Sequence, residues 1–332
     1  MPPPVQQIWQ GLRSLNRRWA PVSGLDVLIR LALAAPLGLA LVALSGVGHR
    51  TFDLLAQFTA PALMATVVVT TVLVLTRLKL AALHGLAACA ALLAAVAPQW
   101  FPDGPEPEPE APVVRLYSAN LWARNTDVDA ILASIRAADA DVVILIELGD
   151  APAKRLDEVL AGYPNRVATP RIDRPTGPAR SVIASRFPLT PIRDRPDGLH
   201  AVGASLRTPA GPVHMVGVHL TRPWPFQEQW GQISQTMALQ AVIEDLDGPV
   251  VVAGDFNSVS SARIGKQVRR DLGLHPAPAF PGTWPSPLPP PLGVTIDHVY
   301  ASDDLAFVSR RLGRANGSDH RPVVVEFTRA VR

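Results

Sequence analysis

VVVAGDFN, residues 250–257, is an apolar run of mostly β-branched residues that ends in Gly, Asp and Asn. This pattern is typical of a buried strand that carries a carboxylate and a carboxamide to its C-terminal edge. Side chains alternate along a strand, so Asp255 and Asn257 are expected to point the same way while Phe256 points into the packing. An acid and an amide on one face suit a water, a metal ion or a phosphate oxygen. Taken alone, the stretch is equally compatible with a β-turn.

Polar side chains of the same chemical set also follow other predicted strands. Asn120 ends VVRLYSAN, Glu147 ends DVVILIE, and His219 follows VHMVGV. Asp297 lies within VTIDHVY, and GSDH, residues 317–320, precedes the apolar run PVVV. Isolated turns at strand ends are common, but this repetition is not. We therefore expect these side chains to converge on one site.

Composition limits the classes of protein and site that fit. The chain has 332 residues and a net charge of +3, which is too slight to indicate a nucleic-acid partner on its own. The single cysteine, Cys89, excludes an internal disulfide and a cysteine-built metal site. It lies in an apolar stretch and is expected to be a small packing residue.

Three apolar runs occupy the N-terminal third of the chain, at residues 25–47, 54–76 and 80–97. Each approaches the roughly 20 residues that a helix needs to cross a bilayer. They predict three transmembrane helices within residues 25–100, preceded by a cytoplasmic segment at 1–24. The alternatives fit less well: a cleaved signal peptide would not be followed by two more such runs, and a buried soluble bundle is less common.

Basic residues predict the orientation of these spans. Arg13, Arg17 and Arg18 precede the first run, and Arg77 and Lys79 lie between the second and third. Basic loops favour the cytoplasmic side, so three crossings would put everything after Trp100 on the extracytoplasmic side. This predicts a multi-pass inner-membrane protein with a periplasmic or other extracytoplasmic domain.

Residues 101–112 contain the acidic, proline-rich sequence DGPEPEPEAP, which predicts a stiff, extended linker that does not pack. Residues 113–332 are long enough for one domain with a substantial core. Within them we expect helices at 126–138, 227–246 and 261–272, with Thr126 as the cap of the first. The many remaining strands predict an α+β fold of two packed β-sheets with helices outside.

The ordered motifs GDFN, IDHVY and SDHRPV, after an Asn-ending first strand and an IxE second strand, resemble the endonuclease/exonuclease/phosphatase superfamily. That superfamily includes deoxyribonucleases, apurinic endonucleases, sphingomyelinases and inositol polyphosphate 5-phosphatases. The resemblance begins at Val113 and does not explain the apolar segment. It implies a four-layered α/β sandwich and hydrolysis of a phosphate ester that depends on Mg²⁺, with Mn²⁺ as the other candidate.

The resemblance also implies roles for individual residues. Glu147, Asn120 and Asp319 would hold the metal ion or its water. Asp255 would accept a proton from the attacking water or orient it, and Asn257 would donate to that water or to the phosphoryl oxygens. His320 would offset charge on the phosphate, with Asp297 fixing its tautomer. His219 matches a histidine that acts at the leaving group or the phosphate. Whether one or two metal ions act stays open.

Several polar residues have simpler structural explanations. Alternation turns His298 to the face opposite Asp297, so we expect it to be structural. His200, His214 and His275 lie outside the motifs and are expected to face solvent or loops. Ser318 is expected to be a turn residue that supports Asp319, and Asp303 and Asp304 are expected to form a solvated turn.

The natural substrate is the least determined property. Acidic and basic residues nearly balance after Val113, whereas a nuclease usually has a stronger basic footprint. Arg222, Trp224 and Trp284 lie in proline-rich loops that are expected to rim the site and contact substrate, although the aromatics could equally pack beneath those loops. We expect a phosphodiesterase or phosphatase acting on a lipid headgroup or a small phosphate ester. The alternatives are an extracytoplasmic nuclease, in which case nucleic acid would be the partner, and an inactive receptor or scaffold. The oligomeric state cannot be predicted.

Overall fold

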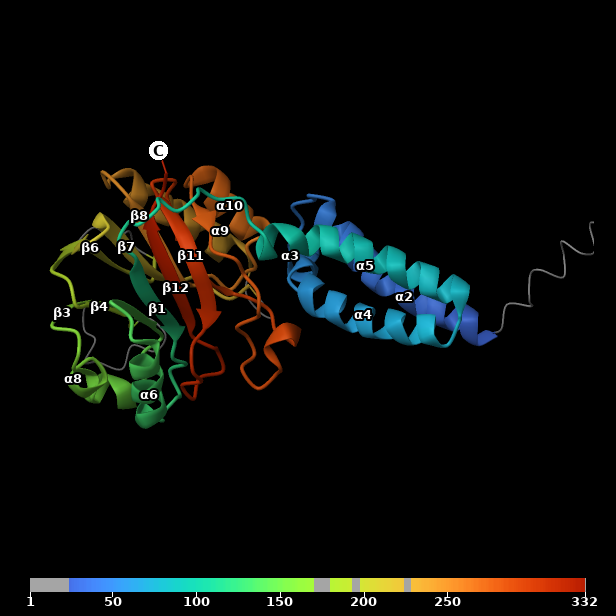
Figure 1. Cartoon of the computed structure of the whole chain (residues 1–332), viewed down its shortest axis with the longest axis horizontal. Coiled ribbons are helices and arrows are strands. Elements are labelled where there is room, and N and C mark those ends of the chain that lie inside the picture. The colour runs from blue at the N-terminus through green and yellow to red at the C-terminus, as the bar shows by residue number, and fades with distance from the viewer. Residues whose placement is uncertain (1–23, 170–179, 193–197, 224–227, 332) are drawn as a thin grey trace, which may run out of the picture.

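The computed structural model describes residues 24–169, 180–192, 198–223 and 228–331. Within this part of the chain, an apolar helical bundle extends from one side of a β-sandwich (Figure 1). The bundle contains α2 (Gly24–Leu44), α3 (Arg50–Ala56), α4 (Thr59–Leu75) and α5 (Lys79–Trp100). The predicted cytoplasmic segment at 1–24 falls almost entirely outside the described residues.

Two of these helices, α2 and α5, are long and apolar enough to cross a membrane. The predicted second span is broken, because α3 and α4 meet at an angle of 52°. A third crossing therefore exists only if this bent pair counts as one span. The apolar composition of residues 54–76 does not reveal the break, since hydropathy reports side chains and not backbone direction.

Two six-stranded mixed sheets form the sandwich. The first has the strand order β11-β12-β1-β2-β4-β3, and the second has the order β5-β6-β7-β8-β10-β9. The strands of the first sheet are β1 (Val114–Asn120), β2 (Val142–Ile146), β3 (Asn165–Ala168), β4 (Val182–Ser185), β11 (Leu305–Leu312) and β12 (Val323–Arg329). Those of the second are β5 (Leu189–Ile192), β6 (Ala201–Thr208), β7 (Gly211–His219), β8 (Val250–Asp255), β9 (His275–Pro276) and β10 (Asp297–Ala301).

Helices cover the outer face of each sheet, which makes four layers. α6 (Val128–Ala138), α7 (Asp150–Lys154) and α8 (Leu156–Val159) accompany the first sheet, and α9 (Trp230–Glu244) and α10 (Arg263–Asp271) accompany the second. Because side chains alternate along each strand, one hydrophobic core lies between the two sheets and a further core lies between each sheet and its helices. In β8, Val251 and Ala253 face the other sheet, whereas Val250 and Val252 pack under α9 and α10. The expected α+β sandwich is therefore present.

Two local expectations were wrong. The cap of α6 is Asp127, whose carboxylate accepts from Ala130 N, rather than Thr126. His275 is buried rather than solvent-facing, with its ring 5.2 Å from that of Phe307.

The acidic linker also packs, contrary to expectation. Glu108 N donates to Arg329 O, and Val331 N donates to Glu106 O, so this segment runs along the end of β12. The Glu108 carboxylate also pairs with Arg329 at 3.2 Å. The prolines of the linker have no backbone N–H, but they do not prevent this pairing, because its N–H donors belong to Glu108 and Val331.

Candidate active site

Strand register brings the predicted polar residues to one end of the sandwich. In the second sheet, His219 at the end of β7 and Asp297 at the start of β10 are both register partners of Asp255 on β8. In the first sheet, Asn120 ends β1 beside Ile146, and Glu147 follows directly. The ends of parallel neighbours meet at one sheet edge, which is why residues far apart in sequence converge.

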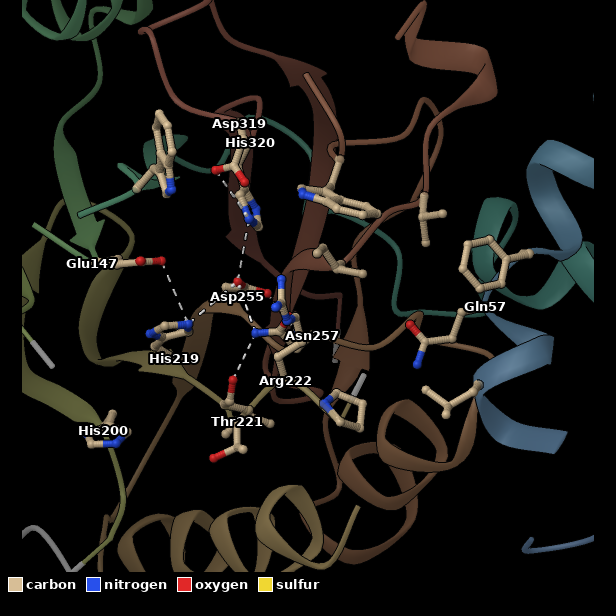
Figure 2. Close-up of a pocket in the computed structure, with 18 of the residues that line it drawn as sticks. Gln57, Glu147, His200, His219, Thr221, Arg222, Asp255, Asn257, Asp319 and His320 are labelled. Carbon is tan, nitrogen blue, oxygen red and sulfur yellow. Dashed lines mark hydrogen bonds and ion pairs between the residues drawn. The ribbon is translucent and has the colours of Figure 1, made fainter. Parts of the chain in front are cut away.

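Asp255 is the centre of this arrangement and is almost fully buried. Its Oδ2 accepts hydrogen bonds from Asn120 Nδ2 at 3.0 Å and from Asn257 Nδ2 at 3.2 Å, and its Oδ1 accepts from Asn257 N at 2.8 Å. The ring nitrogens of His219 and His320 each lie 3.8 Å from Oδ2 (Figure 2). This carboxylate is therefore held in one orientation and faces two imidazoles.

Burial raises the pKa of the Asp255 carboxyl to about 6, against the opposing charge of His320. A desolvated carboxylate loses hydration energy that the ionised form needs. Its pKa therefore lies close to neutral pH, where a carboxylate is an effective acceptor of a proton from water.

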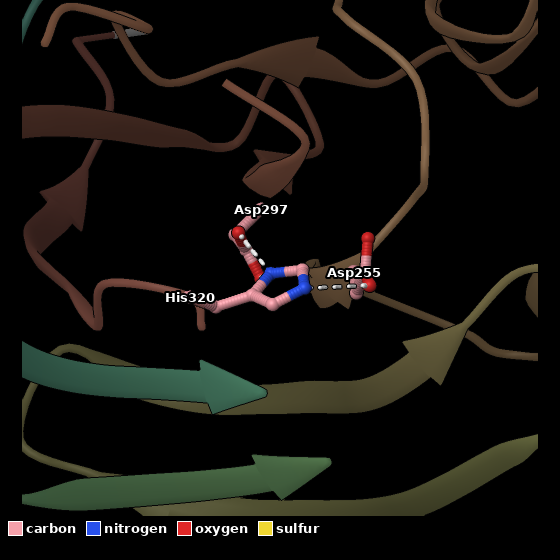
Figure 3. Close-up of side chains that lie close together, drawn as sticks. All are labelled: Asp255, Asp297 and His320. Carbon is pink, nitrogen blue, oxygen red and sulfur yellow. Dashed lines mark hydrogen bonds and ion pairs between the residues drawn. The ribbon is translucent and has the colours of Figure 1, made fainter. Parts of the chain in front are cut away.

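His320 is fixed by a second carboxylate. Its Nδ1 lies 2.9 Å from Asp297 Oδ2 and its Nε2 points toward Asp255 (Figure 3). Burial by itself lowers the pKa of His320, but the carboxylates of Asp297 and Asp255 more than offset this and raise it to about 10. The imidazole is thus an imidazolium at neutral pH, with Nδ1 donating to Asp297 and Nε2 directed into the site.

Backbone conformation also positions the site. Glu147 and Asn257 have φ values of 56° and 49°, in the left-handed region that non-glycine residues rarely adopt. Gly254 has a φ of 142°, and a Cβ there would lie 2.0 Å from Val218 O. Only glycine therefore fits between the parallel strands β7 and β8 at the point where Asp255 emerges. Strained conformations of this kind cluster at functional sites.

Asn257 and Ser318 differ in detail from their predicted roles. Asn257 Nδ2 donates to Leu220 O and to Asp255 Oδ2, so both of its amide hydrogens are used within the protein and it orients Asp255. Ser318 Oγ accepts from His320 N, so it is a turn residue, as expected, but supports His320. His298 is structural as expected: it is buried, and its Nε2 lies 3.0 Å from Ser258 O.

Two carboxylates that could hold a cation lie beside the imidazoles of His219 and His320. Asp319 Oδ1 is buried without a hydrogen-bond partner among the described residues. Glu147 Oε1 accepts from Ala123 N at 3.3 Å, and its Oε2 lies 4.0 Å from His219 Nε2. Carboxylate oxygens with unused acceptor capacity fit a hard divalent cation such as Mg²⁺.

A second grouping could also hold a cation, since one ligand atom from each of Asp255, Asp297 and His320 lies within 4.8 Å of the others. We favour Glu147 and Asp319 as the principal ligands. The Nδ1 of His320 is already bonded to Asp297, and an imidazolium has no lone pair for a metal.

The polar groups open into a cavity of about 600 Å³. Two of the predicted substrate contacts, Arg222 and Trp284, line it, whereas Trp224 lies outside the described residues. Sequence reasoning missed several other lining residues: Leu54, Gln57, Phe58, Trp122, Arg124 and His200. No motif marks them, and three of them belong to the apolar segment that was assigned only to membrane anchoring.

The chain is similar to known proteins and to solved structures. Part of the chain is 34% identical over 97 residues to the UPF0294 protein VP2298 of Vibrio parahaemolyticus, an alignment covering 29% of this chain and 33% of that protein. The chain thus spans about a third of that relative.

Among solved structures, the chain resembles an endonuclease/exonuclease/phosphatase from Beutenbergia cavernae, with a TM-score of 0.53 and 22% identity over 66% of this chain and 72% of the other. It also resembles the mannosyl-6-phosphatase Bt3783 of Bacteroides thetaiotaomicron, with a TM-score of 0.52 and 17% identity over 65% of this chain and 99% of the other. At these identities the likeness shows the fold alone. The model of the Endonuclease/Exonuclease/phosphatase family matches residues 117–320, well over half of the chain, and the chain therefore belongs to that family.

Proposed function

We propose that this chain is a membrane-anchored, Mg²⁺-dependent phosphoesterase, a phosphodiesterase or phosphatase, that hydrolyses a lipid headgroup or small phosphate ester by in-line attack of an activated water. The observation that carries the proposal is the convergence of Asn120, Asn257, His219 and His320 on the buried carboxylate of Asp255. The buried carboxylate can accept a proton from water, and the imidazolium beside it supplies positive charge to the phosphate.

In this mechanism Asp255 orients the attacking water and takes its proton, and its pKa of about 6 suits that task at neutral pH. Asn120 and Asn257 keep the carboxylate in place. His320 donates from Nε2 to a phosphoryl oxygen, while Asp297 stabilises the charged ring. His219, 3.8 Å from Asp255 on the opposite side from Asp297, is suited to contact the phosphate or the leaving group.

Glu147 and Asp319, with Asn120 nearby, would hold the cation. When bound, it would offset the negative charge that builds up on the phosphoryl oxygens. The exposed guanidinium groups of Arg124 and Arg222 line the same cavity and can meet a phosphate with two hydrogen bonds. The balance of charge in the domain supports a small or lipid phosphate over a long nucleic acid.

Membrane anchoring through three crossings, with the bent pair α3–α4 as the second of them, is part of the proposal, and it puts the catalytic domain on the extracytoplasmic side. Arg77 lies in the α4–α5 connection and Lys79 begins α5, at the end of the bundle away from the sandwich (Figure 1). Basic residues at that end favour a cytoplasmic position for it, which would put the sandwich on the other side.

The test uses the full chain in detergent micelles, with Mg²⁺ added or chelated. Substrates are p-nitrophenyl methyl phosphate, p-nitrophenyl phosphate, phospholipid vesicles and plasmid DNA. We expect Mg²⁺-dependent turnover of a small or lipid ester that falls at least ~10³-fold in Asp255→Asn, as expected for a group acting directly in the reaction. Plasmid nicking without turnover of any small or lipid ester would overturn the proposal in favour of a nuclease, and inactivity on every substrate would favour a binding role.

A further inference from the structure

The α3 segment is not only part of the membrane anchor, because it docks on the catalytic domain. Asp53 on α3 is buried and accepts hydrogen bonds from Gln229 Nε2 and, at 2.6 Å, from Arg263 N. Arg263 in turn donates from Nη1 to Gly48 O at 3.1 Å. The start of α10 and the start of α9 therefore hold α3 from two sides.

A second contact holds the bundle at the end of α5. Ala279 N donates to Gln99 O at 2.8 Å, and the rings of Trp100 and Phe280 lie 4.8 Å apart. The 3₁₀ turn η2 (Pro290–Leu292) also packs against α4. Because the contacts lie on separate elements, the bundle has a defined position relative to the sandwich rather than hanging from a free tether.

This docking puts residues of the apolar segment in the wall of the active-site cavity. Leu54, Gln57 and Phe58 line the same cavity as Glu147, Asp255 and His320. In Figure 2, Gln57 lies across the cavity from Glu147 and His219, on the helix that belongs to the bundle. The catalytic groups and the apolar segment thus face one shared space.

The chemistry of this wall indicates what it contacts. Phe58 is 44% exposed although it is a large apolar residue, and Leu54 is only half-buried. Gln57 is only 8% exposed, yet its Nε2 has no hydrogen-bond partner among the described residues. A buried amide without a partner is costly, and rotation about the last side-chain bond, which exchanges the amide oxygen and nitrogen, would turn this donor toward a substrate atom in the cavity that Gln57 lines.

The position of this wall along the bundle matters as well. α2 ends at Leu44 and α5 ends at Trp100, and α3 begins at Arg50, at that same end of the bundle (Figure 1). If α2 and α5 cross the bilayer, α3 lies where the hydrocarbon meets the headgroups, and the bend before α4 turns the chain into the hydrocarbon. The cavity then adjoins the layer in which lipid phosphates lie.

We propose that α3 and its junction with α4 form a binding site for the apolar tail of an amphiphilic phosphate ester presented by the bilayer. In this arrangement Leu54 and Phe58 contact the tail, and Gln57 donates to a polar atom of the substrate. The inference rests on the phosphoesterase function proposed above and assigns its substrate class. Free water-soluble esters would use the catalytic residues and Gln57 without the apolar contacts of Leu54 and Phe58.

The test compares two esters that share one reactive bond and differ only in the tail: p-nitrophenyl hexadecyl phosphate and p-nitrophenyl methyl phosphate. Both are assayed with the full chain in nanodiscs of dioleoyl phosphatidylcholine with Mg²⁺, and each variant is compared with the wild type on the same ester. Leu54→Ser and Phe58→Ser should lower kcat/KM for the hexadecyl ester about tenfold, consistent with one lost apolar contact. Turnover of the methyl ester should stay within about twofold.

Gln57→Met keeps the side-chain length and removes the amide. We expect KM to rise severalfold for both esters with kcat within about twofold, since a uniform binding contact is lost. The matched control is Val68→Ser, an exposed apolar position of α4 that does not line the cavity. It should change neither ester.

The outcomes separate this inference from the proposed function. If the methyl ester is hydrolysed but the Leu54 and Phe58 variants affect both esters equally, or neither, the tail site is refuted while the phosphoesterase function stands. Loss of folding in Leu54→Ser or Phe58→Ser would appear as a lowered thermal midpoint. Leu54→Val and Phe58→Leu then replace them, and they too should lower kcat/KM for the hexadecyl ester more than for the methyl ester. Absence of turnover of either ester would overturn the tail site, and it would overturn the phosphoesterase function as well if p-nitrophenyl phosphate and phospholipid vesicles are also left intact.

Discussion

Replacing Asp297 by Asn removes one charge from the site while keeping its shape. The asparagine oxygen can still accept from His320 Nδ1, so the ring should stay in place. In the wild type the carboxylates of Asp297 and Asp255 raise the pKa of His320 from 6.5 to about 10. That shift corresponds to roughly 5 kcal/mol in favour of the imidazolium.

The two carboxylates share this stabilisation, with Asp297 2.9 Å from Nδ1 and Asp255 3.8 Å from Nε2. Loss of Asp297 should remove about half of it, on the order of 2–3 kcal/mol, so the ratio of imidazolium to neutral imidazole at a given pH falls roughly 30- to 150-fold. We expect kcat to fall in proportion to the fraction of imidazolium that is lost. Because the pKa of His320 falls toward its usual value, the loss should deepen as the pH rises from 7 to 9. The wild-type imidazolium persists across that range.

The assay is Mg²⁺-dependent hydrolysis of p-nitrophenyl methyl phosphate by the full chain from pH 6 to 9. Asp304→Asn is the matched control, since Asp304 is exposed and does not line the catalytic cavity. It should behave as the wild type. A kcat for Asp297→Asn that equals the wild-type value at every pH would show that a charged His320 does not stabilise the reaction.

Three other substitutions probe the metal site, a buried histidine and the docking of α3. Glu147→Gln should raise the Mg²⁺ concentration for half-maximal activity at least ~10-fold, because it removes a charged oxygen ligand. The control Glu158→Gln removes a carboxylate that pairs with Arg155 on the surface, and it should leave that concentration unchanged. Burial lowers the pKa of His298 from 6.5 to about 4, so between these pH values the folded state binds fewer protons than the unfolded state. The free energy of unfolding therefore keeps its full contribution from this group above pH 6.5 and should fall by about 3 kcal/mol as the pH drops to 4. Thermal unfolding against pH measures this, and a variant His298→Gln with the same pH dependence as the wild type would contradict it. Asp53→Ala should lower the free energy of unfolding by about 2 kcal/mol, because Arg263 N and Gln229 Nε2 lose a buried acceptor, while Asp157→Ala at an exposed site should leave the melting midpoint unchanged.

Sequence patterns predicted the central strands and the polar groups at their ends. Continuous β-branched runs with an abrupt polar end, as in β8, favour a buried strand whose last side chain reaches the sheet edge, and their repetition along the chain makes an isolated turn the less favoured interpretation. When two such strands, β7 and β8, pair in parallel, their polar ends meet, and His219 lies beside Asp255. This is why Asp255, Asn257, Asp297 and His320 could be grouped from strand patterns alone.

Features that depend on tertiary contacts could not be predicted in this way. The 52° bend after α3 leaves no trace in hydropathy, so the role of Leu54 and Phe58 in the cavity was missed. Burial of His275 depends on the packing of Phe307 and on the segment at Gly104, which are distant in sequence. The acidic linker was expected to stay unpacked because its composition is polar, yet it pairs through its backbone with the end of β12. Backbone pairing of this kind is independent of side-chain composition.

The proposed function depends above all on attack at phosphorus by a water that Asp255 holds. Hydrolysis of p-nitrophenyl methyl phosphate by the full chain with Mg²⁺ in ¹⁸O-labelled water, with the products analysed by mass spectrometry, measures this step. We expect one labelled oxygen in methyl phosphate and none in p-nitrophenol, and we expect the rate of hydrolysis to fall at least ~10³-fold in Asp255→Asn. Label in the phenol, or an Asp255→Asn variant that turns over as fast as the wild type, would contradict the mechanism.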